Sequence, residues 1–345
     1  MNICFRPSTP DDGPAIVALL HSAGLNPNSE PSDIEWKYWH ERADWRGPRS
    51  FVLTKGSEIV AHAGIVPGTC LWNGHRATVI HATDWAASHA VIGAGVMLVK
   101  HISGLADVAI GVDGSQDALR LRPMLGFRPC GMATMYVRAL HPLRRLASEP
   151  HPSWRTLPRF ARSVLWRVTA PSRQNGEWHA RKLTPAQIQS VGSVLPRAST
   201  NANIVLERSA ALFEYFLACP IASMALYSIE KAGNIRGYFL LAIVPGQARL
   251  VDCWMDSDEP GAWLALVQCA VHAAKQAPAV AELVTVASDP MLSSCLLQSG
   301  FHARWTTPVD VLANRGFGPP PTSLRFQMLD SDAAYRHQGH PEFWA

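Results

Sequence analysis

One order of secondary-structure elements is predicted twice along this chain, and this repeat restricts the fold more than any other feature. Residues 1–138 alternate short strands and helices in the order β-α-α-β-β-β-α-β-α-β, and residues 178–330 repeat that order. Each copy combines an antiparallel meander with a strand–helix–strand step, which needs a parallel pair of strands. The sequence therefore predicts an α/β protein, with a mixed sheet and covering helices in each of two tandem domains.

The chain divides into four parts by this repeat and by its charge. The length of 345 residues fits an N-terminal domain over 1–138 and a C-terminal domain over 178–330, followed by a polar tail over 331–345. Residues 139–177 form a linker or arm that is broken by prolines. From Arg138 to Lys182 there are ten Lys and Arg residues against two acidic ones. A short helix in this arm either packs on one domain with its basic side solvated, or contacts a membrane surface or nucleic acid.

Composition excludes several other classes of protein. The net charge of +4 is far below the basic excess of a dedicated nucleic-acid binder, so no nucleic-acid partner is expected. No run of 18 apolar residues lacks charge or proline, so no transmembrane segment is expected. The seven cysteines contain no C-x-x-C pair and no Cys/His cluster with zinc spacing. They predict free thiols in a reducing cytoplasm, and no metal site.

A glycine-containing segment follows the long strand predicted over residues 76–85. Residues 85–98 lead from this strand into an apolar helix, with Gly93 and Gly95 near the start of the helix. A helix N-terminus has unpaired N–H groups, and its dipole favours anions. Glycines let a phosphate approach the backbone, because no Cβ atom is in the way. The segment either binds a pyrophosphate or only lets the helix pack closely on the sheet.

This segment and two helix endings resemble the GNAT superfamily, the GCN5-related N-acetyltransferases. Residues 85–98 are similar to the family's R/Q-x-x-G-x-G/A segment through Gly93 and Gly95. Residues 115–127 resemble its N-x-x-A…L-G-F helix and strand, and residues 299–301, Ser-Gly-Phe, repeat that ending. The resemblance covers most of the first copy and, more weakly, the second. It implies two tandem GNAT-like acyl-CoA N-acyltransferase domains.

The resemblance also implies a co-substrate, acetyl-CoA or another acyl-CoA, bound by the N-terminal domain. The residues that it implies for this binding are Trp85, Ala86, Val91, Ile92, Gly93, Ala94, Gly95 and Ser115. Three positions depart from the family pattern. Ala90 stands where the family has a basic residue or Gln, and Ser115 stands where it has Asn. Arg122 stands where the family often has the Tyr that protonates the leaving thiolate. In the second copy, residues 254–261 contain three acids in place of the glycines, and these would repel a pyrophosphate. We expect the C-terminal domain to be a degenerate copy with a structural or substrate-shaping role.

The end of the long strand supplies the candidate catalytic residues. Direct acyl transfer needs a positioned amine, a group that takes its proton and a backbone N–H that polarises the carbonyl. Asp84 and His81 are the candidate bases, and alternation along the strand places them on opposite faces. Each also has a structural alternative, because Asp84 can cap a helix or pair with a cation and His81 can be a packed core residue.

Residues 33–40 are rich in aromatic side chains. In the fold that the sequence resembles, the first two helices border the acceptor site. Trp36, Tyr38 and Trp39 could form a flat surface for a sugar or an aromatic acceptor, or they could pack on the sheet. Glu35 or His40 would be the polar anchor of such a surface. We predict an N-acyltransferase that transfers the acyl group to an amine of a small metabolite or an amino sugar. A non-catalytic acyl-CoA-binding or scaffolding protein is the alternative, and a homodimer is compatible with either.

Overall fold

The computed structural model describes residues 3–72, 75–148, 154, 156–171, 176–196, 203–314 and 323–345. The N-terminal half follows the predicted order of elements. Its elements are β1 (Ile3–Pro7), η1 (Pro10–Asp12), α1 (Gly13–Ser22), α2 (Pro31–Tyr38), β2 (Ser50–Lys55), β3 (Glu58–Trp72), β4 (His75–Ala87), α3 (Ala94–Ser103), β5 (Val108–Val112), α4 (Gln116–Met124) and β6 (Arg128–Ala139).

The arm and the C-terminal half follow. The arm folds as two helices, α5 (Pro142–Ala147) and α6 (Thr156–Thr169). The C-terminal half contains β7 (Trp178–Lys182), η2 (Pro185–Ser193), β8 (Asn203–Val205), α7 (Ala210–Leu217), β9 (Ser223–Lys231), β10 (Asn234–Val244), β11 (Gln247–Met255), α8 (Pro260–Gln276), β12 (Glu282–Ala287), α9 (Pro290–Gln298), β13 (His302–Ala313), β14 (Ser323–Arg325), η3 (Met328–Asp330) and η4 (Asp332–Ala334). The sequence predicts a helix from Thr184 towards Leu195, and the structure has a 3-10 helix there, η2.

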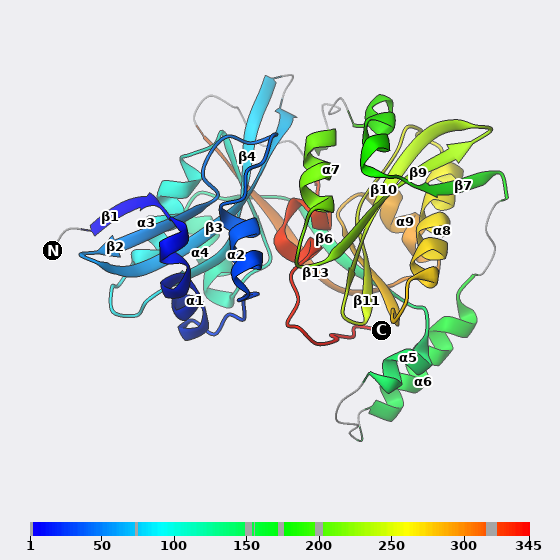
Figure 1. The fold of residues 1–345 in the computed structure, drawn as a ribbon, viewed down its shortest axis with the longest axis horizontal. Coiled ribbons are helices and arrows are strands. Elements are labelled where there is room, and N and C mark those ends of the chain that lie inside the picture. Colours follow the sequence, from blue (N-terminus) through cyan, green and yellow to red (C-terminus); the bar gives the residue numbers. More distant parts are fainter. Residues whose placement is uncertain are drawn as a thin grey trace.

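Among the described residues, twelve strands form one mixed sheet in the order β1-β2-β3-β4-β5-β13-β6-β12-β11-β10-β9-β7. The two halves exchange their last strands in this sheet. β13 of the C-terminal half lies between β5 and β6, and β6 of the N-terminal half lies between β13 and β12. Figure 1 shows β6 and β13 crossing the middle of the molecule. The predicted α/β class, a mixed sheet with covering helices, is confirmed, but the described strands of the two halves join in one sheet instead of forming a sheet in each half.

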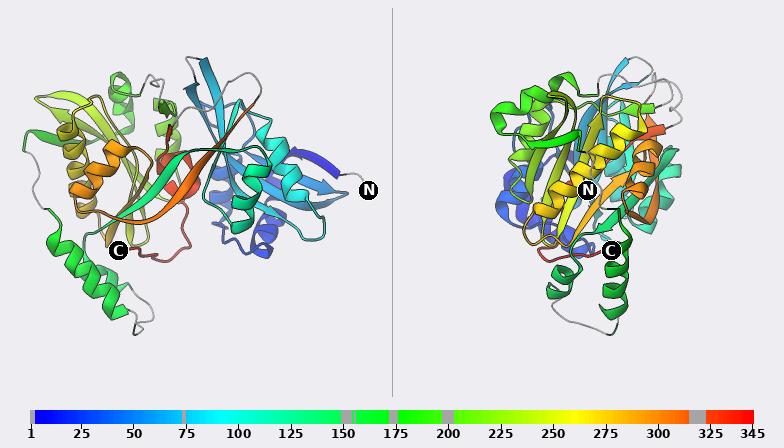
Figure 2. Two further views of the ribbon diagram at one scale, coloured as in Figure 1. Left: turned by 180° about the vertical axis from the view of Figure 1, so that it is seen from behind. Right: turned by 90° about the vertical axis from the view of Figure 1, so that its right-hand side faces the viewer.

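Helices cover both faces of the sheet. Figures 1 and 2 show α2 and α7 on one face and α3, α4 and α9 on the other. The largest core cluster lies on the α2 and α7 face and contains residues of both halves, among them Trp36, Phe213 and Val286. Because both its faces are covered, every residue of β12 is buried, the polar Glu282 and Thr285 included.

The last part of the chain returns to the middle of the molecule. η3 and η4 lie against β11 and α2, where Lys37 of α2 forms an ion pair with Asp332 of η4 at 2.9 Å. Tyr335 and Ala345 are buried, so residues 328–345 pack against both halves of the sheet. Of the helices in the described part of the chain, none is long and apolar enough to span a membrane.

Candidate functional site

The central strands of the N-terminal half separate beside the glycine segment. β4 and β5 pair in parallel only over residues 79–81 and 108–110. Beyond this point β4 has a bulge, in which Asp84 and Trp85 lie opposite the single residue Ala63, and Asp84 has a positive φ of 48°. No described segment pairs with β4 between Ala82 and Trp85 on the side of β5. The edge of β4 therefore presents backbone groups that an extended ligand could bind.

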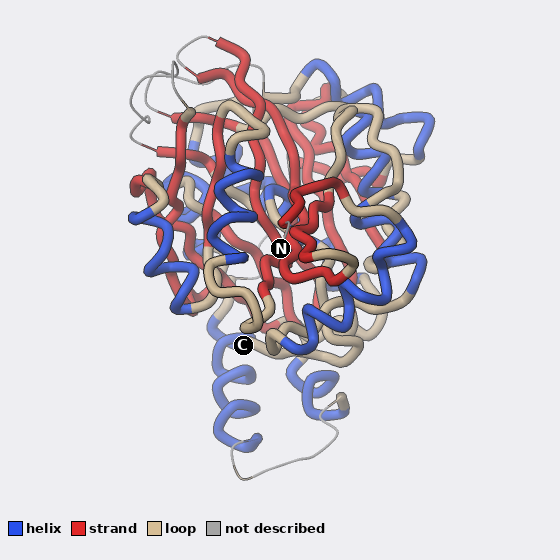
Figure 3. Tube along the Cα trace, turned by 90° about the vertical axis from the view of Figure 1, so that its left-hand side faces the viewer, coloured by secondary structure: helices blue, strands red, loops and turns tan. Residues whose placement is uncertain are grey.

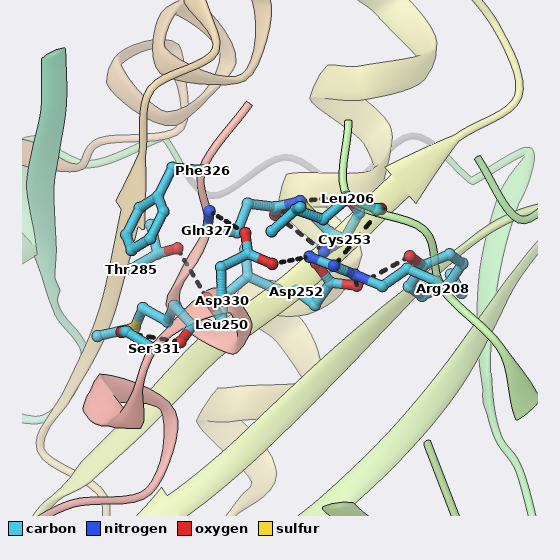
Figure 4. A network of polar contacts seen from close by, with 12 residues as sticks. Leu206, Arg208, Leu250, Asp252, Cys253, Thr285, Phe326, Gln327, Asp330 and Ser331 are labelled. Carbon is cyan, nitrogen blue, oxygen red and sulfur yellow. Dashed lines mark hydrogen bonds and ion pairs between the residues drawn. The ribbon is translucent and has the colours of Figure 1, made fainter. Parts of the chain in front are cut away.

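The corresponding separation in the C-terminal half is filled by the chain itself. β11 and β12 pair only over residues 247–249 and 282–284. Gln327 enters between them, where its Oε1 accepts a hydrogen bond from Cys253 N at 3.0 Å and its Nε2 donates to Cys253 O at 3.1 Å (Figure 4). Phe326 bonds to Ser288 of the segment after β12 at 2.7 Å. The space that is open in the N-terminal half is occupied in the C-terminal half.

A second group of side chains closes the C-terminal half further. The guanidinium of Arg325 lies over the rings of both Trp254 and Trp263, 4.6 and 4.5 Å from their centroids. Asp289, which caps α9, is 3.7 Å from the same guanidinium. Trp254 and Trp263 flank the segment that connects β11 to α8, which is the position of the glycine segment in the N-terminal half. An Arg side chain thus fills this position.

The glycine segment itself forms a turn before α3. Gly93 is the N-cap residue of α3 and has a φ of 81°, a backbone conformation that favours glycine. The first bond within the helix runs from Met97 N to Gly93 O at 2.9 Å, so the N–H groups of Gly95 and Val96 have no partner within the helix. The first turn of α3 contains no acidic residue. This helix end presents free amides and no repelling charge to an anion.

Gly95 has a packing role as well. A Cβ atom at Gly95 would lie 3.1 Å from Nε1 of Trp85 and 3.2 Å from Cβ of Ala87. The same indole nitrogen donates a hydrogen bond to Gly95 O at 3.1 Å. Gly95 therefore allows close packing on Trp85, and Gly93 shapes the turn.

The other residues that the resemblance implied for the co-substrate lie around this turn. Ile92 is almost fully exposed at its tip, Val91 packs against the core beneath it, and Ala94 is buried at the helix start. Ala86 is buried on the α1 and α2 face of β4, away from the turn. Ser115 caps α4, where its Oγ accepts a hydrogen bond from Ala118 N at 3.2 Å.

Asp84 is enclosed in a buried cluster of charges. Its carboxylate forms an ion pair with Lys37 and accepts a hydrogen bond from the Tyr38 hydroxyl at 2.5 Å, and Lys37 also pairs with Asp332. Burial alone would raise the pKa of Asp84, but the Lys37 ammonium and the hydrogen bonds from Lys37 and Tyr38 lower it to about 2. A carboxylate with so low a proton affinity, already paired with a cation, is poorly suited to take a proton at neutral pH.

The C-terminal half contains a matching cluster, which the sequence did not reveal. Arg208 forms a two-point ion pair with Asp252 at 3.0 and 2.9 Å, and Tyr238 donates to the same carboxylate at 2.8 Å. Arg208 also pairs with Asp330 of η3 at 2.8 Å, as Figure 4 shows. In each half, therefore, a cation joins an Asp of the central strand to an Asp of the 3-10 segments near the C-terminus.

His81 lies at a different place from Asp84. Its Nδ1 is 3.1 Å from the carbonyl oxygen of Ile110, at the last paired position of β4 and β5. A carbonyl only accepts hydrogen bonds, so Nδ1 has the proton and Nε2 has a free lone pair. Burial lowers the pKa of His81 below its usual 6.5, which favours the neutral ring. A neutral ring with a free lone pair on Nε2 is able to accept a proton.

His81 also lines two cavities. One, of about 670 Å³, lies between β3 and β4 on one side and α7 and η3 on the other. Its wall includes the charged residues Arg42, Asp44, Glu207, Arg208 and Asp330. The second, of about 260 Å³, is lined by Val112 at the end of β5 and by Arg249, Asp332 and Trp305.

The four candidate acceptor residues of α2 do not share one surface. Trp36 is buried and stacks on Tyr215 of α7 with ring centroids 4.5 Å apart, and Tyr38 is buried against Asp84. Trp39 and Glu35 face the opposite way and line a separate cavity beside α1. Arg122, at the family's Tyr position, folds over Gly111 and is 3.4 Å from Asp310 of β13. The described residues contain no group of three or more His, Cys, Asp or Glu side chains able to hold a metal.

Comparison with known proteins identifies the fold. No family model and no curated protein sequence matches this chain. Among solved structures, a GCN5-related N-acetyltransferase from Anabaena variabilis superposes with a TM-score of 0.58 at 10% identity, covering 90% of this chain and 72% of that one. N-myristoyltransferase of Saccharomyces cerevisiae with bound myristoyl-CoA gives 0.61 at 13% identity, with coverages of 91% and 79%. A tandem GNAT protein from the clavulanic acid biosynthesis pathway gives 0.56 at 12% identity, with coverages of 92% and 99%. This chain therefore has the tandem GNAT-like fold that its sequence predicted.

Proposed function

We propose that the protein is an N-acyltransferase that takes its acyl group, most simply acetyl, from acyl-CoA. The acceptor is an amine of a small metabolite or an amino sugar. The observation that supports this best is the contrast between the halves. The separation of β4 from β5 is open beside a glycine turn, whereas Gln327 and Arg325 fill the equivalent space in the C-terminal half.

The residues around the turn fit an acyl-CoA. The free amides of Gly95 and Val96 suit its pyrophosphate, because a helix N-terminus attracts anions and no acid lies in the first turn. The unpaired edge of β4 between Ala82 and Trp85 suits the amides of its pantetheine arm. The bulge at Asp84 leaves backbone N–H groups outside the sheet ladder, and one of these can polarise a thioester carbonyl. Acyl-CoA, when bound, supplies the thioester that is attacked.

Of the two candidate bases, we assign the role to His81. The amine nitrogen attacks the thioester carbon while Nε2 takes the proton of the amine. The carbon–sulfur bond then breaks, and the thiolate leaves and takes up a proton from solvent or from the imidazolium. Asp84 holds Lys37 and Tyr38 in place and takes no part in proton transfer. The large cavity beside His81 is the place for the acceptor.

The state of the cysteines bears on the cellular compartment in which the protein works. None of the seven cysteines, all of which the structure describes, forms a disulfide, and five of them are buried. This agrees with a reducing compartment, and we propose the cytoplasm.

One observation favours the alternative, a non-catalytic acyl-CoA-binding protein. Arg122 stands at the position of the family's proton-donating Tyr, and its guanidinium is held by Asp310 and by the carbonyl of Asp113. A guanidinium does not give up a proton at neutral pH. Under this alternative the protein binds acyl-CoA and transfers nothing.

Two measurements test the proposal. Calorimetric titration with acetyl-CoA should show binding that Gly93→Val abolishes. Gly24→Val is the matched control, since Gly24 also has a positive φ and open space around its Cα. Release of free CoA thiol should then be followed with a panel of amines and amino sugars. No binding of acetyl-CoA contradicts both functions, whereas binding without thiol release from any amine favours the non-catalytic alternative.

A further inference from the structure

The hairpin of α5 and α6 presents an apolar stripe to the outside of the molecule. The exposed apolar residues of α6 are Leu157, Ala161, Val164, Leu165 and Val168. They follow the three-and-four spacing of a single helix face. The exposed fractions of Leu157 and Val168 are 71% and 76%. The apolar side of this helix therefore points away from the protein.

The polar side of α6 faces the protein. Ser163 is buried and accepts a hydrogen bond from Arg145 of α5 at 2.8 Å. Trp166 stacks on His302 of β13, with ring centroids 3.9 Å apart. Arg167 donates to the carbonyl of Leu140 at 3.0 Å. Turning the stripe inward would break all three contacts, so its exposure is built into the fold.

The hairpin projects from one end of the molecule. Figures 1, 2 and 3 all show α5 and α6 extending beyond the body of the sheet and its covering helices. A flat surface can therefore reach the stripe without contact to the rest of the protein. Leu143 of α5 and Trp154, between the two helices, add exposed apolar area to the same projection.

The positive charge of the hairpin indicates which kind of surface binds the apolar stripe. The described residues of 139–171 include the arginines 144, 145, 159, 162 and 167, and no Asp or Glu. Arg144 is exposed and bonds to the carbonyls of Ala277 and Val280, which do not cancel its charge, and Arg159 is exposed as well. A second copy would bring the same positive charge to the contact. An anionic surface would be attracted.

We propose that the α5–α6 hairpin docks on an anionic lipid bilayer. The stripe of α6 enters the boundary between headgroups and acyl chains, and the positive charge of the hairpin attracts the anionic headgroups. Amphipathic helices with basic residues bind in this way, and their affinity combines buried apolar area with attraction to anionic lipids. Docking here leaves the open edge of β4 free, so it does not depend on the function proposed above.

Sedimentation with lipid vesicles tests this proposal on the whole chain. The protein should sediment with vesicles of phosphatidylcholine and phosphatidylglycerol and not with phosphatidylcholine alone, and high salt should weaken the binding. Leu165→Asp with Val168→Asp should lower the partition coefficient at least about 10-fold, because it puts charge on the stripe. Arg159→Gln, which leaves the stripe unchanged, should lower it about 5-fold.

Leu297→Asp is the matched control. Leu297 is an exposed apolar residue of α9, outside the hairpin, and this variant should bind as the unchanged protein does. Circular dichroism and thermal unfolding check that all variants are folded. Lack of binding to the anionic vesicles, or full binding by the stripe variant, overturns the proposal. A dimer by light scattering that the stripe variant dissociates would assign the stripe to a second copy and overturn it too.

Discussion

Asp84 and Asp252 occupy equivalent positions in the two halves of the protein. Asp84 follows His81, the last residue of β4 paired with β5, by three positions, and Asp252 follows Arg249 of β11 by three. Each is buried, pairs with a cation and accepts a hydrogen bond from a Tyr hydroxyl. The pair recurs in the half whose strand separation is filled, and this recurrence supports a structural role for Asp84.

Replacement of either Asp should therefore lower the free energy of unfolding. Asp252→Asn leaves the buried Arg208 with Asp330 alone, and Asp84→Asn leaves Lys37 with Asp332 alone. Each should lower the free energy of unfolding by about 3 kcal/mol, as for other broken buried pairs. Urea unfolding at neutral pH measures this. Equal stability of Asp84→Asn and the unchanged protein would contradict a structural role for Asp84.

The low pKa of Asp84 predicts how this stability responds to acid. Its pKa is about 2 in the folded protein, below the ordinary 3.8, so the folded state binds the proton less well than the unfolded state. The contribution of the ionised Asp84 to the free energy of unfolding is complete above about pH 4 and is lost as the pH falls through 4 towards 2. Unfolding curves measured across this range should show a steeper loss for the unchanged protein than for Asp84→Asn. Parallel curves would contradict this assignment.

His81 should control the rate and not the binding of acyl-CoA. His81→Gln keeps a side chain of similar reach that cannot act as a base, so kcat should fall about 100- to 1000-fold. The dissociation constant for acetyl-CoA should stay unchanged. Because burial lowers the pKa of His81, kcat should be constant at neutral pH and fall only below the ordinary value of 6.5. A fall that begins above pH 7, or full activity of His81→Gln, would exclude His81 as the base.

The sequence predicted the elements well, and their long-range neighbours poorly. Gly93 marks the turn before α3 because a left-handed backbone needs glycine, and such local rules are visible in a single sequence. The exchange of β13 and β6 was not predicted, because the alternating pattern of a half-buried strand such as β13 does not show which strand it pairs with. The choice of neighbour depends on contacts between residues that are far apart in the chain.

In the candidate site, too, local features could be predicted from the sequence and contacts between distant residues could not. Trp36 was a candidate for an exposed acceptor surface, but its partner Tyr215 lies 179 positions later, and no local pattern places the two together. Arg208, Asp252 and Asp330 come from three separate segments, so their ion pairs could not be predicted. The roles of Asp84 and His81 in catalysis stay predictions, although their surroundings now separate a paired carboxylate from an imidazole with a free nitrogen.

Acyl-CoA should bind with a stoichiometry of one per chain. Gln327 already occupies the backbone groups of Cys253 that a second acyl-CoA would need, and Arg325 lies over the rings of Trp254 and Trp263. Calorimetry with acetyl-CoA gives the number of sites directly. Gln327→Ala should lower the free energy of unfolding by about 1–3 kcal/mol, since it leaves buried groups of β11 unpaired. Two sites in the unchanged protein would contradict this account of the C-terminal half.

Asp330 should make the protein less stable as the pH rises towards neutral. Burial raises its pKa from 3.8 to about 6, with a further rise from the nearby Asp252, and both outweigh the attraction of Arg208. The folded state therefore binds the proton better than the unfolded state, and the stability that this proton gives is lost as the pH rises from about 4 through 6. The loss at neutral pH is about 3 kcal/mol for a shift of this size.

Asp330→Asn keeps a neutral side chain of the same shape, so its unfolding free energy should change less between pH 4 and pH 7 than that of the unchanged protein. Asp289→Asn, a carboxylate of the same half outside this cluster, is the control, and an identical pH dependence of Asp330→Asn and the unchanged protein would show that Asp330 is ionised throughout.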